Sequence, residues 1–266
     1  MGQQSAAMYL MSQLGIFPKL DYSIFADPGR EKSETYKYLN WLIKEQKKNN
    51  WTPIIWDKSK NLYEDILNQE NSTGQRFASI PAYTQSGGMI RRQCTNEYKI
   101  NVVDNVIRDL QGVKKNHSFK PVNLWFGISI DELQRMFGPH RKNVTHVYPF
   151  CGYYNDGNGF KELEWGIKMN RSDINSWMKK NGYPIPPKSS CVFCPFQDDN
   201  SWLELKRNHP EDFKAAVKVD KSIRNMTKRG LTDKIYLHDS LKTLDKAEFK
   251  EAQVKMNFDC YGYCNT

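Results

Sequence analysis

The feature that most constrains this chain is a pair of cysteines separated by two residues, Cys191-Val192-Phe193-Cys194, and closed by Pro195. Two intervening residues let the backbone turn back, so both sulfurs can face one point. A tetrahedral metal ion or an iron–sulfur cluster takes half of its ligands in this way. A redox dithiol is less well supported, because no thioredoxin-like context surrounds the pair. Further ligands must come from elsewhere, and the candidates are Cys94, Cys151, Cys260 and Cys264.

The composition limits the class of protein. The chain has 266 residues, of which 39% are apolar, which suits one large domain or a domain with an appended lobe. No run approaches the roughly 18 apolar residues of a membrane span, and Met1–Ser5 does not begin a signal peptide. We therefore expect a cytoplasmic protein with no membrane partner. In that compartment six cysteines are more often ligands or catalytic thiols than disulfides.

The chain is basic, with a formal charge of +9 and a pI near 9.1. Such a charge fits a polyanionic partner such as a nucleotide, DNA or tRNA. The lysine pairs Lys47-Lys48, Lys114-Lys115 and Lys179-Lys180 are scattered, however, so a solvated lysine-rich surface explains the charge equally well.

Segments typical of strands and helices alternate in the first part of the chain. The expected strands are 21–26, 53–56 and 122–129, and the expected helices include 33–43 and 62–67. This order predicts an α/β fold in which helices cover both faces of a parallel sheet. Ligands of such sheets bind beyond the carboxyl ends of the strands. Gly2–Ser5 and Asp27–Gly29 are expected at that edge.

The last hundred or so residues read as mainly helical. A helix is expected over 171–178, where Ser172 can cap the start, and amphipathic helices are expected over 200–207 and 210–224. The proline-rich segment 183–188 leads rigidly into the cysteine pair. We therefore predict a nucleotide-binding α/β domain over 1–165 and a helical, cysteine-containing lobe over 166–266.

Two segments are candidate anion sites. Arg91, Arg92 and Lys99 cluster with Cys94 near an expected helix start, where arginine forks suit phosphate or sulfate and positive charge favours a thiolate. The alternative is a solvated basic helix end with a buried cysteine. Gly2–Ser5 opens a helix whose first N–H groups can hold phosphate, and an ordinary capped helix is its alternative.

Four other polar residues each allow two interpretations. His238 fits either a phosphate contact or a hydrogen-bonded residue at a strand end. Asp131, Glu132 and Arg135 follow an expected strand, so they either line a site or form a salt-bridged helix start.

Several segments together carry a family resemblance. In chain order they are Gly2-Gln3-Gln4-Ser5, Asp27-Pro28-Gly29 with Ser33-Glu34-Thr35-Tyr36, Arg92-Gln93-Cys94-Thr95 with Lys99, Met169–Ile174, and Pro186–Cys191 with Cys194-Pro195-Phe196. The chain resembles the phosphoadenosine-phosphosulfate (PAPS) reductase family of the PP-loop, or adenine nucleotide alpha-hydrolase-like, superfamily. It is most similar to members from phages and mobile elements, which implies a host cytoplasm.

The resemblance implies a Rossmann-like core that binds ATP or a PAPS-like nucleotide. Gly2, Gln3, Gln4 and Ser5 would then cradle phosphates, and Asp27 and Gly29 would lie near the nucleotide. Phosphate or sulfate would be neutralised by Arg91, Arg92 and Lys99. Relatives of this type include DNA phosphorothioation sulfurtransferases, tRNA thiolation enzymes and sulfonucleotide reductases.

The resemblance also implies a metal centre. A four-iron four-sulfur cluster would be held by Cys94, Cys191 and Cys194, with Cys260 as the favoured fourth ligand and Cys264 or Cys151 as alternatives. A structural zinc on the same thiolates is the other interpretation. A cysteine desulfurase is the expected sulfur donor, and DNA or tRNA a candidate acceptor.

The expected function is adenine-nucleotide-dependent sulfur transfer. The first alternative is sulfonucleotide reduction, in which Cys260 or Cys264 is the nucleophile. The second is a non-catalytic binding module with structural zinc. Two departures from the family bear on this choice. Gln4 stands where the PP-loop has an aspartate, so magnesium handling is expected to differ. The loop follows a strand in the family, so we expect either an upstream strand or a sheet that lacks it.

Overall fold

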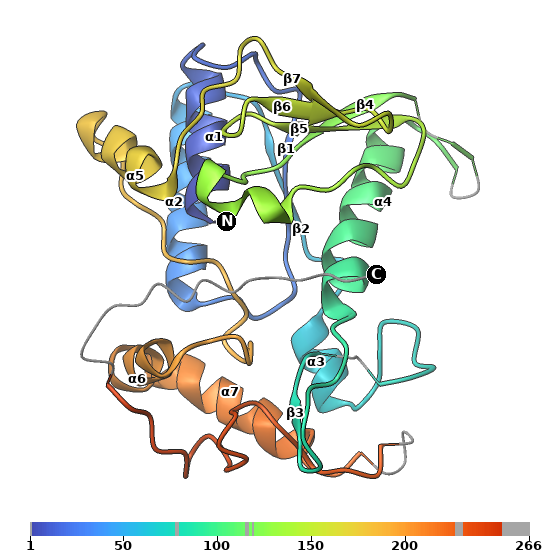
Figure 1. The fold of residues 1–266 in the computed structure, drawn as a ribbon, viewed down its shortest axis with the longest axis vertical. Helices are drawn as coiled ribbons and strands as arrows, with labels where there is room; N and C mark the ends of the chain where they lie inside the picture. Colours follow the sequence, from blue (N-terminus) through green and yellow to red (C-terminus); the bar gives the residue numbers. More distant parts are fainter. Residues whose placement is uncertain (1, 78–79, 115–116, 119, 227–230, 252–266) are drawn as a thin grey trace. The chain divides into compact units, whose positions relative to one another are not determined.

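The computed structural model describes residues 2–77, 80–114, 117–118, 120–226 and 231–251 (Figure 1). The chain divides into two compact units that interleave along the sequence. Unit 1 comprises Met1–Phe25, Glu34–Ile55 and Asp104–Ser189, and unit 2 comprises Ala26–Ser33, Trp56–Val103 and Ser190–Thr266. This division rests on packing, and the boundary expected between residues 165 and 166 stays a prediction.

Unit 1 contains most of the strands. Its elements are α1 (Gln3–Gln13), β1 (Ser23–Ala26), α2 (Ser33–Lys48), β2 (Ile54–Asp57), α4 (Asn101–Leu110), β4 (Val122–Trp125), the 3-10 helix η2 (Ile130–Arg135), β5 (Val144–Tyr148), β6 (Tyr153–Asn155), β7 (Phe160–Glu162) and α5 (Arg171–Lys180), some of which end in unit 2. β1 pairs with β2, and a second sheet has the order β4-β5-β6-β7. β4 and β5 are parallel, whereas β6 and β7 continue the sheet antiparallel.

The mixed α/β class expected from the sequence is confirmed, and the strands expected near residues 23, 54 and 122 are present. The described strands of unit 1 form two separate sheets, with one parallel pair in the larger. A single Rossmann-like sheet therefore stays a prediction.

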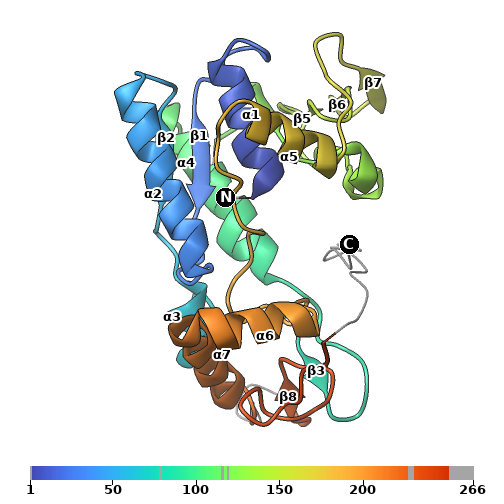
Figure 2. The same cartoon turned by 90° about the vertical axis from the view of Figure 1, so that its left-hand side faces the viewer.

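α1 is a core helix of unit 1. Its residues Ala6–Met11 are all buried, so the helix has no polar face over its middle turns. α5 packs beside it, as both ribbon views show (Figures 1 and 2), and buries Ile174 and Met178. Phe17, which follows α1, places its ring against those of Trp125 and Trp165.

The start of α5 corrects one expectation. Ser172 does not cap the helix, because Asn170 occupies the N-cap. The Asn170 side chain accepts the N–H of Asp173 at 2.9 Å, and the Asp173 carboxylate accepts the N–H of Asn170 at 2.9 Å. This reciprocal capping box satisfies two N–H groups at once.

Unit 2 contains α3 (Leu62–Leu67), β3 (Tyr83–Thr84), the π-helix η1 (Asn96–Ile100), α6 (Asp199–Asn208), α7 (Pro210–Ser222) and β8 (Ile235–Tyr236). β3 and β8 form an antiparallel pair, and α6 packs on α7 (Figure 2). One hydrophobic core joins these elements, with Trp202, Leu205, Val219 and Phe193 almost fully buried. Among the described residues, no helix has the length and apolarity needed to cross a membrane.

Candidate functional site

The cysteine pair of unit 2 forms a tight turn. The N–H of Cys194 donates to the carbonyl of Cys191 at 3.1 Å. The side-chain amide of Gln197 donates to the carbonyls of Val192 at 2.9 Å and Cys194 at 3.2 Å. Val192 and Phe193 are buried in the core, whereas the two cysteines are half-buried. The apolar residues therefore anchor the turn in the core.

A short antiparallel bridge brings the segment after β1 to this turn. The N–H of Val192 donates to the carbonyl of Arg30 at 3.1 Å, and the N–H of Lys32 donates to the carbonyl of Ser190 at 3.2 Å. Glu31 and Cys191 face each other in this bridge. Residues far apart in the sequence thus lie side by side in unit 2.

Asp27 and Gly29 shape the start of that segment. The buried Asp27 carboxylate accepts the N–H of Gly29 and the indole N–H of Trp56, each at 2.8 Å. Gly29 has a φ of +91°, and a Cβ there would lie 2.0 Å from the side-chain oxygen of Asn61. Only glycine fits this position. The two residues expected near a nucleotide therefore also have a structural role in the turn.

Cys94 and Lys99 lie in the same part of unit 2. Cys94 precedes η1, a helix type that often marks functional sites, and it packs against the same core as Cys191. Lys99, within η1, holds its ammonium 2.9 Å from the carboxylate of Glu31, whose side chain is only 1% exposed. Glu31 raises the pKa of Lys99 above its usual value. The lysine is therefore a fixed positive charge beside the thiols.

Burial dominates the chemistry of the two thiols. It raises the pKa of Cys94, although Arg92 and Lys99 act to lower it. It also raises the pKa of Cys191, with further increases from Glu31 and from Cys94, while Lys99 opposes the rise. Both thiols are therefore protonated at neutral pH in the metal-free protein, and a bound metal would have to displace their protons.

The sulfurs do not form a compact trio. Among the described residues, no set of three that includes Cys94, Cys191 or Cys194 has its ligand atoms all within 4.8 Å of one another. Zinc bound at about 2.3 Å in a tetrahedron would bring its sulfurs to about 3.8 Å. The described cysteines are all free of disulfides.

Arg92 also lies near the cysteine turn. Its guanidinium is 5.8 Å from the ring centre of Phe196, two residues beyond Cys194. Arg91 is exposed on the same segment. The basic residues expected to meet phosphate or sulfate are thus in unit 2 with the thiols.

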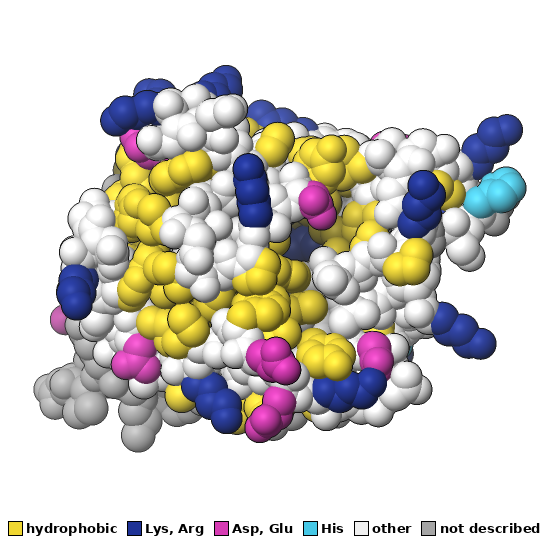
Figure 3. All heavy atoms as spheres, turned by 90° about the horizontal axis from the view of Figure 1, so that it is seen from above, with side chains coloured by type: hydrophobic (Ala, Val, Ile, Leu, Met, Phe, Trp, Pro, Cys, Tyr) yellow, Lys and Arg dark blue, Asp and Glu magenta, His cyan; other side chains and the backbone are white. Residues whose placement is uncertain are grey.

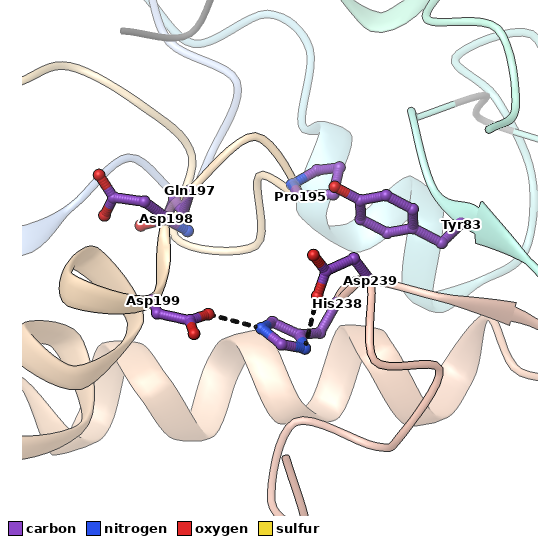
Figure 4. Close-up of a pocket in the computed structure, with 7 residues that line it drawn as sticks. All are labelled: Tyr83, Pro195, Gln197, Asp198, Asp199, His238 and Asp239. Atoms are coloured by element: carbon purple, nitrogen blue, oxygen red, sulfur yellow. Dashed lines mark hydrogen bonds and ion pairs between the residues drawn. The ribbon is translucent and has the colours of Figure 1, made fainter. Parts of the chain in front are cut away.

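A polar pocket of about 240 Å³ adjoins the turn (Figure 4); its lining residues are Tyr83, Pro195, Gln197, Asp198, Asp199, His238 and Asp239. The buried His238 lies between two carboxylates, with Nε2 2.9 Å from Asp199 and Nδ1 3.3 Å from Asp239. Nδ1 is also 2.8 Å from the Ser240 hydroxyl. Its expected reading as a hydrogen-bonded residue at a strand end fits these contacts.

Sequence reasoning missed the other pocket residues. Burial raises the pKa of Tyr83, and Asp239 and Cys194 raise it further, so the Tyr83 ring lies near the cysteine turn. Nothing in the sequence around Tyr83 points to this. Asp198 could have been identified as a helix N-cap, because it accepts the N–H of Ser201 at 2.7 Å at the start of α6.

The Gly2–Ser5 segment lies in unit 1 and begins α1, with Gly2 at the N-cap and no acidic residue in the first turn. A Cβ on Gly127 would lie 2.7 Å from the backbone nitrogen of Ser5, so glycine permits this close approach. The amide of Gln4 donates to Glu132 at 3.1 Å, and its contact with the Ser129 hydroxyl is 3.4 Å. Gln4 is therefore bound within the protein.

Glu132 organises this part of unit 1. Its carboxylate is 2.8 Å from Arg135 and 2.7 Å from Arg171, and the residue is 3% exposed. Of the two readings for Asp131, Glu132 and Arg135, the salt-bridged helix start matches these contacts. The amide of Gln4 is thus paired with a carboxylate from another element.

Comparison of the chain with protein-family models, curated proteins and solved structures found no match in any of the three.

Of the remaining three cysteines, the structure describes one and leaves two outside the described residues. Cys151 lies in unit 1, fully buried, and its thiol donates to the carbonyl of Ile128 at 3.2 Å. It has the contacts of a packed core residue. Cys260 and Cys264, expected as fourth ligand or nucleophile, lie outside the described residues.

Proposed function

We propose that this chain is an adenine-nucleotide-dependent sulfur-transfer enzyme whose cysteine centre in unit 2 holds an iron–sulfur cluster. One observation carries the proposal. Cys94 and Cys191, from distant segments, lie in one partly buried cluster with Lys99, and Glu31 fixes that lysine. If this segment were only a solvated helix end with an unrelated cysteine, we would not expect it to pack beside the Cys-x-x-Cys turn.

The donor set fits such a cluster. Thiolates are soft ligands that iron–sulfur centres prefer. The ligands of a cluster bind different irons, so their sulfurs lie farther apart than in a zinc site, which suits the spread of these cysteines. When bound, a cluster supplies a centre that holds or passes sulfur. Lys99 offsets the negative charge of the thiolates, and Gln197 fixes the turn that presents Cys194.

The nucleotide would be held by the α1 N-terminus in unit 1. First-turn N–H groups and the positive end of the helix dipole favour phosphate, and the absence of acidic residues there removes repulsion. In the reaction, an acceptor oxygen attacks the α-phosphorus and the bond to pyrophosphate breaks. Basic side chains stabilise the charge that develops. Sulfide, released from a persulfide by a thiol reductant, then attacks the activated atom of the acceptor. The bond from that atom to the adenylate oxygen breaks, and AMP leaves.

Direct reduction of a sulfonucleotide is the alternative within this class. It would use Cys260 or Cys264 as the nucleophile. DNA or tRNA would be the acceptor in the transfer reaction, and a cysteine desulfurase would supply the sulfur.

A non-catalytic binding module is the second candidate. One observation favours it: the Gln4 side chain, at the PP-loop aspartate position, is bound to Ser129 and Glu132. That loop therefore offers no carboxylate for magnesium in the described structure.

Nucleotide binding separates the two candidates. We expect ATP to bind in calorimetry and to release pyrophosphate slowly. The variant Gln3→Glu places a carboxylate in the first turn of α1 and should weaken ATP about tenfold by charge repulsion. The matched variant Asn105→Asp adds the same charge at an exposed position of α4 and should bind ATP normally. A protein that neither binds ATP or a PAPS-like nucleotide nor releases pyrophosphate is not this enzyme.

A further inference from the structure

The connections that lead into β4 and β5 are basic. The first spans residues 111–121 and the second spans 136–143, and neither contains an aspartate or glutamate. Their described basic residues are Lys114, Lys120, Arg141 and Lys142, and each connection also has one histidine, His117 or His140.

The register of the sheet places the two connections together. β4 and β5 are parallel, with Val122 opposite Val144. The N–H of Val122 donates to the carbonyl of Asn143 at 3.0 Å, so the first residue of β4 touches the last residue of the second connection. Parallel strands enter a sheet from the same edge. We call this surface, made of residues 114, 117, 120 and 140–142, the β4–β5 edge.

Most of the positive charge at the β4–β5 edge is exposed. Lys114, Lys120 and Lys142 are exposed side chains. Arg141 is anchored by an ion pair of 2.6 Å with the largely buried Asp104 of α4. The exposed Asp109, near the end of α4, is a neighbouring acid in sequence. Three exposed lysines therefore remain to meet an anion.

An aromatic row lies farther along the same sheet, towards the ends of β4 and β5. Phe137, 39% exposed, places its ring centre 5.3 Å from that of Phe126. Phe126 stacks on Tyr148 at 5.6 Å, and Tyr148 contacts Phe160, which is 48% exposed on β7. Figure 3 shows one face on which hydrophobic side chains are bordered by Lys, Arg, Asp and Glu side chains and by a histidine. Rings beside positive charge are typical of sites where bases stack and phosphates are neutralised.

We propose that the β4–β5 edge binds single-stranded nucleic acid. Lys114, Lys120 and Lys142 contact backbone phosphates, and an unpaired base stacks on the exposed ring of Phe137. The aromatic row lies on a sheet rather than on an amphipathic helix, which favours a nucleic acid over a lipid surface. This proposal does not depend on the nucleotide chemistry proposed above.

The test measures the anisotropy of a labelled single-stranded DNA of mixed sequence on the full chain. The double variant Lys120→Glu, Lys142→Glu should lose about tenfold or more in affinity, with a shallower salt dependence. The control Lys179→Glu, Lys180→Glu makes the same charge change at exposed positions of α5 and should stay within about twofold. Equal losses in both variants would overturn the proposal, because net charge would then explain the binding.

The aromatic contact needs its own variants. Phe137→Ala should weaken single-stranded DNA about fivefold or more and leave duplex DNA unchanged, whereas Phe137→Tyr keeps the ring and should keep the affinity. If Phe137→Ala fails to fold, the comparison of Phe137→Tyr with Phe137→Leu decides. Equal loss for single strand and duplex would overturn the stacking contact. Tighter binding of phosphatidylserine vesicles than of DNA, lost in the lysine variant, would overturn the choice of ligand.

Discussion

The side-chain amide of Gln4 donates a hydrogen bond of 3.1 Å to the buried carboxylate of Glu132. The two residues come from α1 and η2, and the same carboxylate also meets Arg135 and Arg171. An aspartate in place of Gln4 would face another carboxylate here. Gln4, which differs from the aspartate of the PP-loop pattern, is therefore the better residue beside the Glu132 carboxylate.

The first prediction concerns this contact. Gln4→Glu keeps the shape of the side chain and exchanges a donor for a second negative charge, so it should lower the free energy of unfolding by about 2–3 kcal/mol. The loss should shrink as pH falls and the new carboxyl group protonates. Urea unfolding at pH 7.5 and at pH 5 measures both effects.

Gln3→Glu is the control for that experiment. It adds the same charge one residue earlier, where the residue is half-buried and the helix dipole favours an acid. Its stability should be unchanged or slightly higher. Equal destabilisation by both variants would contradict the role given to Glu132.

The second prediction concerns Lys99 and Glu31, tested in the metal-free protein. Lys99→Met removes the lysine from a carboxylate that is only 1% exposed and should cost about 2–3 kcal/mol. Glu31→Gln should cost about 1 kcal/mol or less, because the Lys99 side chain is 42% exposed and can turn to water.

The double variant completes the cycle for this ion pair. Lys99→Met with Glu31→Gln should recover part of the larger loss, because no unpaired charge is then left. A larger cost for Glu31→Gln than for Lys99→Met would show that the lysine, rather than the glutamate, depends on the pair.

The third prediction concerns pH. Burial, helped by the nearby carboxylates of Asp131 and Glu132, raises the pKa of Cys151 to about 11. Since its folded pKa exceeds its unfolded value, this thiol stabilises the fold below about pH 9 and loses that contribution as pH rises towards 11, by about 2–3 kcal/mol. Cys151→Ala should show a flatter decline in urea unfolding over this range. An equal decline of stability with pH in the wild type and in Cys151→Ala would contradict the raised pKa of Cys151.

The fourth prediction concerns the start of α5. Asn170→Ala should cost about 1 kcal/mol, because it removes the side chain that accepts the N–H of Asp173. Ser172→Ala, two residues later and exposed, should be nearly neutral. Thermal unfolding of both variants compares them directly, and the reverse order would restore Ser172 as the cap.

Local sequence patterns predicted where the helices and strands lie better than they predicted which segments contact one another. The strands near residues 23, 54 and 122 follow from short apolar runs, and α6 and α7 follow from their amphipathic spacing. Ser172 was expected as the N-cap of α5, whereas Asn170 occupies that position. The capping box at Asn170 can be identified only when the first residue of the helix is known.

The candidate site shows the same limit. Cys94, Lys99 and the cysteine pair could be singled out by residue type and order. Glu31 could not, because its place beside Lys99 comes from a tertiary bridge with Cys191 that no local pattern records. The contacts of Glu132 with Gln4 and Arg171, and the place of Tyr83 in the pocket, were missed for the same reason: they form only after distant segments pack.

The central claim is that Cys94 and Cys191 help to hold an iron–sulfur cluster, and metal analysis of anaerobically purified protein tests it most directly. Wild type and Cys151→Ser should contain about four iron and matching sulfide per chain and absorb in the blue, whereas Cys94→Ser and Cys191→Ser should lose both. A colourless protein with one zinc per chain, or full iron in the Cys94→Ser and Cys191→Ser variants, would contradict it.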